Sequence, residues 1–303
     1  MKNILVVGSI NMDLLLHTKR IPHPGETMLS EEYTFGPGGK GANQAVACAL
    51  LGANTTFVCK IGSDDFGAQL KQGLINNGVD VSHVSVSPRN SGFCVIMLED
   101  GNNRLIVHLA SNLDLTREDV DAAFASGKYD GMVIQFELAE DIVIYACEKA
   151  RKADIPYIVD TGPAINFPLE KIRGMEILSP NETETAALCG ITPVSPEDCL
   201  QAAKLLAQRS NARHIVLKMG EKGAVHYHNG ETTHYPAHKV ELVDATAAGD
   251  VFTAALAVQY LTHGDMKKAI EYANIAGALT VTKAGAQGSI PTSSEVDVVL
   301  EKA

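Results

Sequence analysis

Short runs of β-branched and other apolar residues alternate along the chain with longer segments of helical periodicity. The strand-like runs are Ile4–Val7, Thr56–Ile61, Gly131–Gln135, Tyr157–Asp160, Glu176–Leu178 and His214–Lys218. The helix-like segments are Ala42–Leu51, Gly67–Asn77, Glu140–Ala153, Pro196–Arg209, Phe252–Thr262 and Met266–Ala284. This alternation predicts βαβ units and therefore an α/β fold in three layers, α/β/α, with a mostly parallel central sheet.

Two stretches, at about 11–40 and 91–111, interrupt this alternation. In the second, Gly92–Leu98 and Arg104–Leu109 flank the turn Glu99–Asn103. We expect both stretches to form antiparallel strands inserted into a single domain that spans residues 1–303. Ligands of α/β folds bind at the carboxyl ends of the parallel strands, so a small sheet inserted there would serve as a lid.

Composition and charge narrow the class of protein. The 303 residues carry a net charge of −11, which argues against a nucleic-acid binder held by phosphate contacts. No apolar stretch reaches the roughly 18 residues of a membrane span, and the apolar part of the N-terminus is too short for a secretory signal. The six scattered cysteines form no C-x-x-C pair, which is typical of reduced thiols in a cytoplasmic protein.

The segment Asp244–Asp250 is rich in small residues and runs into the apolar stretch Val251–Ala257, which is typical of a buried helix. Small residues let the backbone approach a ligand closely, and the free N–H groups of a helix N-terminus bind anions. A carboxylate beside such a phosphate site is suited to take the proton from an attacking hydroxyl group. The segment therefore predicts a phosphotransferase.

Two further segments near the N-terminus suit a small polar ligand. Asn11-Met12-Asp13 offers donors and acceptors for a polyhydroxyl compound, although an Asx turn explains the same residues. Gly36–Gln44 is a glycine cluster that opens a helix and contains Lys40 and Asn43, both able to hydrogen-bond a ligand. It is not a phosphate-binding Walker loop, because a glycine follows the lysine where serine or threonine is required.

Three segments in the second half of the chain carry candidate nucleotide and metal contacts. Asn181–Glu184 predicts a helix N-cap, and its glutamate is also suited to hold the hydration shell of Mg²⁺. Lys218–Gly223 is either a simple hairpin turn or a loop that brings backbone close to a nucleotide. The carbonyls and hydroxyl of Lys283–Ser289 are suited to a hard cation.

Four histidines, at positions 226, 228, 234 and 238, surround the dipeptide Asn229-Gly230. Asn-Gly between alternating residues is a strong hairpin signal, and His226 and His228 then share one face. No cysteine or closely spaced ligand pair completes a zinc site, so we expect histidines of a surface strand.

Six motifs occur in an order that resembles the ribokinase-like (phosphofructokinase-B type) family of sugar and nucleoside kinases. They are Gly8–Asp13, Pro24–Thr27, Gly38–Ala45, Gly62–Gly67, Pro180–Glu184 and the pair Asp244 and Asp250. The resemblance extends over essentially the whole chain. It implies ATP-dependent phosphorylation of the primary hydroxyl of a sugar, expected to be D-ribose with ribose 5-phosphate as the product. It also implies an α/β core with a small β-sheet lid, which is often the contact of a homodimer.

The resemblance also assigns roles to residues. The sugar-binding residues that it implies are Asn11, Met12, Asp13, Gly39, Lys40, Gly41, Ala42, Asn43, Glu137 and Asp250. Asp250 is implied as the general base, beside an anion hole made by the backbone amides of Ala247, Ala248 and Gly249. The ATP-binding residues that it implies are Asn181, Lys218, Met219, Gly220, Glu221, Lys222, Gly223, Gly249 and Asn274. Mg²⁺ is implied at Glu184 through water, and K⁺ at the loops containing Asp244, Thr246, Thr280, Lys283, Gly285 and Ser289.

Four places depart from the pattern of the family, one of them Pro37, which adds stiffness before the glycine pair. Lys218 stands where threonine is frequent, and Asp160–Ala164 replaces a more usual Asn-Pro-Ala-Pro-Ala. His108–Asn112 lacks the glycine often found before its asparagine. These departures leave open a kinase for deoxyribose, another sugar or a nucleoside. A non-catalytic sugar-binding regulator is disfavoured by the intact Asp250, and an NAD-dependent dehydrogenase by the missing glycine fingerprint after the first strand.

Overall fold

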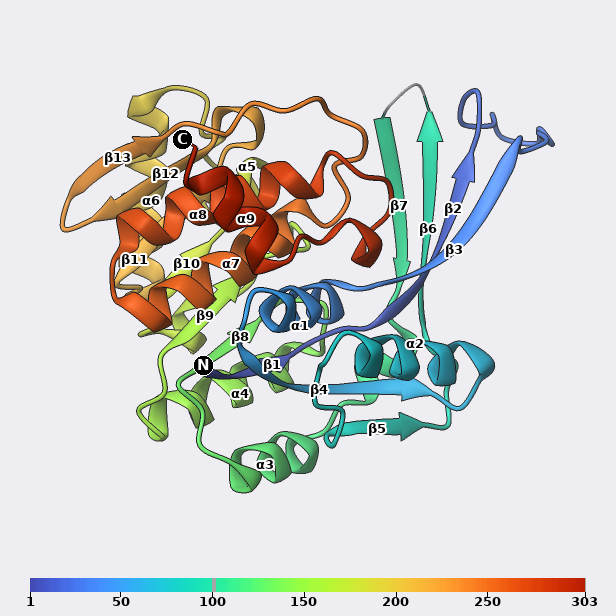
Figure 1. Cartoon of the computed structure of the whole chain (residues 1–303), viewed down its shortest axis with the longest axis horizontal. Helices are drawn as coiled ribbons and strands as arrows, with labels where there is room; N and C mark the ends of the chain where they lie inside the picture. Colours follow the sequence, from blue (N-terminus) through green and yellow to red (C-terminus); the bar gives the residue numbers. More distant parts are fainter. Residues whose placement is uncertain (100–101, 303) are drawn as a thin grey trace.

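The chain folds around a large twisted sheet, seen in a computed structural model that describes residues 1–99 and 102–302 (Figure 1). Its strands are β1 (Asn3–Val7), β4 (Asn54–Gly62), β5 (Val84–Ser87), β8 (Gly131–Ile134), β9 (Tyr157–Asp160), β10 (Ile177–Ser179), β11 (His214–Lys218), β12 (Ala224–His228) and β13 (Glu231–Tyr235). Their order across the sheet is β13-β12-β11-β10-β9-β8-β1-β4-β5. Every pairing from β11 to β5 is parallel, and β12 and β13 extend that sheet in the antiparallel sense.

Helices cover both faces of this sheet. One face packs against α1 (Lys40–Leu50), α2 (Asp65–Asn76), α7 (Ala248–His263), α8 (Met266–Thr280) and α9 (Ser293–Leu300). The other packs against α3 (Arg117–Ser126), α4 (Glu140–Lys152), α5 (Glu182–Cys189) and α6 (Pro196–Ser210). Side chains of a strand point alternately to the two faces, so Ile4 and Val6 of β1 join the first cluster while Leu5 and Val7 join the second. The predicted three-layer α/β/α class is confirmed.

A second, smaller sheet stands beside the core, on the right in Figure 1. Its strands are β2 (Asn11–His17), β3 (Glu32–Gly38), β6 (Gly92–Glu99) and β7 (Asn102–His108), in the order β3-β2-β6-β7. The pairings β2–β3 and β6–β7 are antiparallel as predicted, but β2 and β6 run parallel. Each of the two insertions contributes a hairpin, and the hairpins meet through strands of the same direction. The middle of the predicted turn at 99–103, residues 100–101, lies outside the described residues.

The sequence pattern located the core elements closely. Tyr157–Asp160 and His214–Lys218 are strands with the predicted bounds. The predicted helix Met266–Ala284 ends earlier, at Thr280, because the chain turns there into the loop that carries Gly285 at a φ of +85°. The strand β5 and the helices α3 and α9 were not predicted from the sequence. Both of these helices begin with a capping box, a signal that the sequence contains.

Two glycines determine how closely α1 approaches the end of β1. A Cβ atom on Gly41 would lie 2.6 Å from the carbonyl carbon of Gly8 and 2.6 Å from the amide nitrogen of Ser9. Both neighbours are backbone atoms, so no side-chain rotation relieves the contact. This close approach brings the first turn of α1 against the chain that leaves β1 for the second sheet.

Within the described residues, no helix combines the length and the apolar character that crossing a membrane requires.

The glycine contact gives a stability test with a matched control. We expect Gly41→Ala to lower the free energy of unfolding by about 1–3 kcal/mol, the usual cost of overpacking. Gly73 lies within α2 and has open space around its Cα, so Gly73→Ala should raise the free energy of unfolding by about 0.5–1 kcal/mol. Chemical denaturation of the two variants checks both signs. Equal effects of the two substitutions would contradict the close approach of α1 and β1.

Candidate functional site

A cavity of about 1070 Å³ brings together most of the residues that the sequence predicted. The predicted residues that line it are Asn11, Asp13, Gly39, Lys40, Asn43, Glu137, Asn181, Glu184, Lys218, Gly220, Glu221, Gly223, Thr246, Ala247, Ala248, Gly249, Asp250 and Asn274. Four side chains of the second sheet, which the sequence analysis did not single out, also line it: Cys94, Ile96, Leu105 and Val107. The cavity therefore lies where the carboxyl ends of the core strands face the second sheet.

Ten predicted site residues do not line this cavity. Five belong to the predicted sugar and ATP sites, namely Met12, Gly41, Ala42, Met219 and Lys222, and five to the predicted cation loops, namely Asp244, Thr280, Lys283, Gly285 and Ser289. Met12 is buried, and the alternation of side chains along β2 turns it away from the face that Asn11 and Asp13 share. Gly41 and Ala42 are buried in the first turn of α1. Met219 is buried in the core, whereas Lys222 is exposed.

The small-residue loop delivers the N-terminus of α7 to the cavity, as the sequence predicts. Ala247 caps the helix in the left-handed conformation, with a φ of 64°. Within the described residues, the N–H groups of Ala247, Gly249 and Asp250 donate no hydrogen bond. The N–H of Ala248 donates to the carbonyl of Ala245 at 3.3 Å. Because these donors are free and lie at the positive end of the helix dipole, the loop is suited to an anion.

Asp250 lies in the first turn of α7 and is 5% exposed. Its Oδ1 accepts a hydrogen bond from Lys40 Nζ at 2.7 Å, and its Oδ2 accepts one from Asn43 Nδ2 at 2.9 Å. Both donors come from the first turn of α1. The carboxylate is therefore held in a single orientation at the wall of the cavity.

The ion pair of Asp250 and Lys40 continues through Asp160, the last residue of β9. Asp160 is fully buried, with Oδ1 3.4 Å from Lys40 Nζ and Oδ2 2.9 Å from Lys218 Nζ. Lys218 Nζ in turn lies 4.0 Å from Glu184 Oε2. Carboxylate and ammonium groups thus alternate along one row: Asp250, Lys40, Asp160, Lys218 and Glu184. From the sequence, Asp160 is expected only as a departure from the family pattern and Lys218 as a departure and an implied ATP contact, and nothing in the sequence pairs the two.

This row of charges shifts the pKa values of Asp160 and Lys40. Burial alone would raise the pKa of Asp160, but Lys218 and Lys40 hold it well below its usual range. Burial alone would lower the pKa of Lys40, but the carboxylates around it, Asp160 and Asp250 foremost, raise it well above its usual range. Both groups therefore stay charged at neutral pH.

Gly162 makes room for this row. A Cβ atom there would lie 2.0 Å from Lys40 Cε and 2.9 Å from Glu184 Oε1. Glu184 closes a capping box at the start of α5, where its Oε2 accepts from the backbone N–H of Asn181 at 2.8 Å, as the sequence predicts. The same oxygen accepts from the Thr161 hydroxyl at 3.0 Å. The capping role and the place in the cavity wall thus coexist in one side chain.

Polar groups at the other end of the cavity lack partners. Asp13 Oδ1 and Asn43 Oδ1 are buried, and neither has a hydrogen-bond donor in the described chain. Buried polar atoms of native proteins are nearly always paired, so orphaned acceptors in a cavity wall indicate a ligand that brings donors, such as hydroxyl groups. Burial and the nearby charges of Glu137 and Asp250 raise the pKa of Asp13 from its usual 3.8 to about 7.

Asn112 belongs to His108–Asn112, one of the segments that depart from the family pattern, and its hydrogen bonds support this end of the site. Its Oδ1 accepts from the backbone N–H of Ile10 at 2.8 Å, and its Nδ2 donates to Asn11 Oδ1 at 2.9 Å. Ser9 fixes Glu137 from the same stretch of chain, donating to its Oε2 at 2.6 Å. The segment between β1 and β2 is thereby held in place on both sides.

The two loops of the predicted cation site meet at Asp244. Its Oδ1 accepts from the backbone N–H and the hydroxyl of Thr246, at 2.9 and 2.7 Å, and its Oδ2 accepts from the N–H of Gly285 at 2.8 Å. The hydroxyls of Thr280 and Ser289 donate to main-chain carbonyls, so their lone pairs remain free as acceptors. Within the described residues, no group of three or more His, Cys, Asp or Glu side chains gathers in a way that could hold a metal ion.

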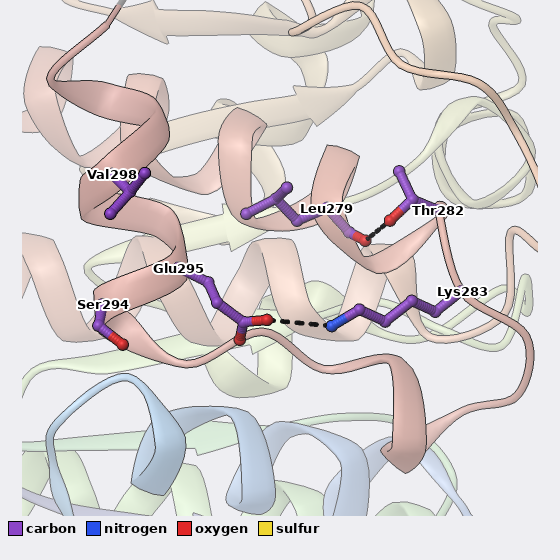
Figure 2. A pocket seen from close by; sticks show the side chains of 6 residues that line it. All are labelled: Leu279, Thr282, Lys283, Ser294, Glu295 and Val298. Carbon is purple, nitrogen blue, oxygen red and sulfur yellow. Dashed lines mark hydrogen bonds and ion pairs between the residues drawn. The ribbon is translucent and has the colours of Figure 1, made fainter.

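Lys283 directs its side chain to α9. Figure 2 shows its ammonium paired with Glu295, at 3.1 Å, across a small pocket between the end of α8 and the start of α9. The pocket is lined by Leu279, Thr282, Lys283, Ser294, Glu295 and Val298. Only the main chain of Lys283 is therefore available to the cation loop.

The histidine hairpin forms as predicted, with Asn229-Gly230 between β12 and β13. His226 and His228 share a face, but they also pack with His214 of β11, which the sequence analysis did not include. His214 Nδ1 and His226 Nε2 lie 2.9 Å apart, and burial lowers the pKa of His226 to about 4. The rings of His214, His226 and His228 form a packed cluster that is more buried than the surface histidines expected from the sequence.

The comparisons with known proteins agree with this geometry. The pattern of the pfkB family carbohydrate kinases matches residues 1–293. Ribokinase from Bacillus subtilis is 36% identical over 302 residues, which cover 99% of this chain and 100% of that protein. Deoxyribokinase from Salmonella typhi is 32% identical over 98% of both chains. The structure of Arabidopsis thaliana ribokinase complexed with ribose and ATP matches 99% of both chains, with a TM-score of 0.89 at 30% identity.

The raised pKa of Asp13 predicts how stability depends on pH. Between about pH 4 and pH 7 the folded protein keeps a proton on Asp13 that the unfolded chain has released, so the free energy of unfolding falls as pH rises through this window. Asp13→Asn removes this dependence and should gain up to about 4 kcal/mol relative to the wild type between pH 4 and pH 8. Urea denaturation across this range measures it. Asp154→Asn, at an exposed position outside the cavity, is the control, and parallel wild-type and Asp13→Asn profiles would contradict the assignment.

Proposed function

Because the chain belongs to the pfkB family of carbohydrate kinases, we propose that it transfers the γ-phosphoryl group of ATP to the primary hydroxyl of D-ribose, giving ribose 5-phosphate and ADP. One observation carries this proposal: a buried carboxylate, Asp250, lies beside the free N–H groups at the start of α7, in the same cavity as two orphaned acceptors. The similarity to ribokinases over the full length of the chain supports ribose as the sugar.

In the proposed mechanism, Asn11, Asp13, Gly39, Asn43 and Glu137 bind the sugar hydroxyls. Asp13 Oδ1 and Asn43 Oδ1 accept the hydrogen bonds that the free protein leaves unmade. This end of the cavity thus orients the primary hydroxyl towards Asp250, with apolar side chains of the second sheet covering the sugar.

At the reacting end, Asp250 takes the proton of the primary hydroxyl while its oxygen attacks the γ-phosphorus. The bond from phosphorus to the bridging oxygen breaks, and ADP leaves with the electron pair. The free amides of Ala247 and Gly249 donate to the transferred group, where negative charge is concentrated, and the amide of Ala248 joins them by releasing the carbonyl of Ala245. Lys40 and Asn43 hold the base in place.

The nucleotide is proposed to lie along Asn181, the Lys218–Gly223 loop, Gly249 and Asn274. Glu184 suits Mg²⁺ held through water, because its buried carboxylate lies in the cavity wall beside the proposed nucleotide and Mg²⁺ needs few protein ligands beside phosphate. When bound, the ion neutralises phosphate charge. The loops tied together by Asp244 suit K⁺, held mostly by main-chain oxygens, and the ion would keep the start of α7 in shape.

We further propose a cytoplasmic homodimer formed through the second sheet, which acts as a lid inserted in a single domain. Large apolar side chains are exposed on that sheet, among them Tyr33 and Phe35 of β3 and Ile106 of β7. Exposed apolar patches of this kind are typical of protein contacts. The six free thiols support a reducing compartment.

A same-fold kinase for deoxyribose is the second candidate, supported by the deoxyribokinase relative. A coupled assay of ADP formation with ribose, deoxyribose, fructose, sugar phosphates and nucleosides separates the two. We expect the highest kcat/KM with ribose, and a higher rate in KCl than in NaCl at equal ionic strength. If ADP forms with another acceptor but not with ribose, ribose is the wrong substrate and that acceptor takes its place. If no acceptor stimulates ADP formation, the proposal of a kinase is wrong.

Asp250→Asn tests the general base. We expect kcat to fall by about 10²–10⁴-fold, the usual contribution of a positioned base, with ribose binding largely retained. Calorimetry measures the binding, because the chain has no tryptophan to report it. Asp297→Asn, at an exposed position on α9, is the control and should match the wild type. Turnover by Asp250→Asn near the wild-type rate would exclude this residue as the base.

A further inference from the structure

Lys218 lies at the phosphate end of the cavity with hydrogen-bonding capacity to spare. It is 7% exposed, and its Nζ donates to Asp160 Oδ2 at 2.9 Å. An ammonium group has three N–H donors. Within the described residues, Asp160 is the one acceptor in hydrogen-bond distance, since Glu184 Oε2 lies at 4.0 Å. Two donors of a nearly buried ammonium are thus left without an acceptor, in a side chain that lines the cavity.

The position of this ammonium is fixed by the sheet. Lys218 is the last residue of β11 and Asp160 the last of β9, with β10 between them. Neighbouring strands lie about 5 Å apart, so the lysine reaches across about 10 Å of sheet to the aspartate. The backbone N–H of Lys218 donates to the carbonyl of Pro180 at 2.8 Å, next to the start of α5. The side chain is therefore anchored at both ends.

The free donors lie beside the anion loop. A Cβ atom built on Gly249 would be 3.7 Å from Lys218 Nζ, so the ammonium approaches the first turn of α7. Glu184, the proposed Mg²⁺ residue, flanks it on the other side. A group bound between the helix N-terminus and Glu184 would have its oxygen atoms within reach of this lysine.

The need to neutralise Asp160 does not by itself explain why a lysine lies at position 218. That carboxylate also accepts hydrogen bonds from Thr253 Oγ1 at 2.9 Å, Gln44 Nε2 at 3.2 Å and the N–H of Gly162 at 3.0 Å, and Lys40 Nζ lies 3.4 Å away. Without Lys218, Asp160 would keep three hydrogen bonds and one counter-charge.

We propose that Lys218 is a catalytic residue whose ammonium, held by Asp160, donates to oxygen atoms of the β- and γ-phosphates of the nucleotide. This inference rests on the proposed phosphoryl transfer. As the bond between the γ-phosphorus and the bridging oxygen breaks, charge builds on the departing ADP, and Lys218 stabilises it without giving up a proton. The proton of the sugar hydroxyl goes to Asp250, so Lys218 contributes charge alone.

Three variants separate this role from a structural one: Lys218→Met, Asp160→Asn and the double variant. Breaking a buried ion pair leaves an unpaired charge, whereas removing both charges often restores stability. We therefore expect Lys218→Met to lose stability and the double variant to recover it. For Lys218→Met we expect kcat with ATP and ribose to fall about 10²-fold. The double variant should keep this defect, and Lys218→Arg should regain part of the lost rate.

Nucleotide binding gives a readout that does not require turnover. In calorimetry, Lys218→Met should weaken the binding of ATP and of ADP by about tenfold or more. The affinity for AMP should stay within about twofold of the wild-type value, because AMP lacks the phosphates that the lysine contacts. Lys204→Met, an exposed lysine on α6, is the control and should match the wild type throughout.

The results of these experiments distinguish failure of the inference about Lys218 from failure of the proposed function. A double variant with wild-type turnover, or equal weakening of ATP, ADP and AMP, would make Lys218 a structural partner of Asp160 and overturn the inference. If the wild type binds ATP but no acceptor stimulates turnover, the proposed function fails. The binding series then still decides whether Lys218 contacts the phosphates.

Discussion

The buried carboxylate of Asp160 between two ammonium groups is the contact on which the site depends. Moving a single charge into a protein interior costs several kcal/mol, so such a group stays charged only where opposite charges and hydrogen bonds surround it. Lys40 arrives from the start of α1, Lys218 from the end of β11 and Thr253 from α7. Because all three must reach β9, the carboxylate fixes the relative positions of these elements. Lys40 then carries the constraint to Asp250.

The second sheet places constraints of a different kind on the cavity. Chain segments leave the core after β1 and return through α1, and the two glycines at that junction allow close backbone contact. Asn112 ties the start of β2 to the segment that follows β7. The polar wall is thus held by hydrogen bonds, whereas the facing wall consists of apolar side chains such as Ile96 and Val107. Acceptors on one side and apolar cover on the other suit a small polyhydroxyl ligand.

Much of the fold and of the site could be predicted from local patterns in the sequence. The strand ending in Asp160 and the capping box of Asn181 and Glu184 follow from apolar runs and helix-start signals, which act over a few residues. The anion loop was also predictable, since small residues before an apolar helix have a local physical meaning. By contrast, the parallel pairing of β2 with β6 could not be predicted, because it joins strands about 80 residues apart through contacts that no local pattern encodes.

The sequence by itself determined the α/β class, the loop at the start of α7 and the residue types that surround a phosphate and a sugar. Local hydrophobic periodicity, capping and backbone freedom are properties of neighbouring residues, so they are visible in the chain. Only the tertiary structure decided that Asp160 and Lys218, 58 positions apart, are partners across β10. It also decided that Met12 turns away from the cavity while Cys94 and Leu105 line it. Charge pairing and burial depend on which distant segments of the chain are in contact, and only the packing of the folded chain determines those contacts.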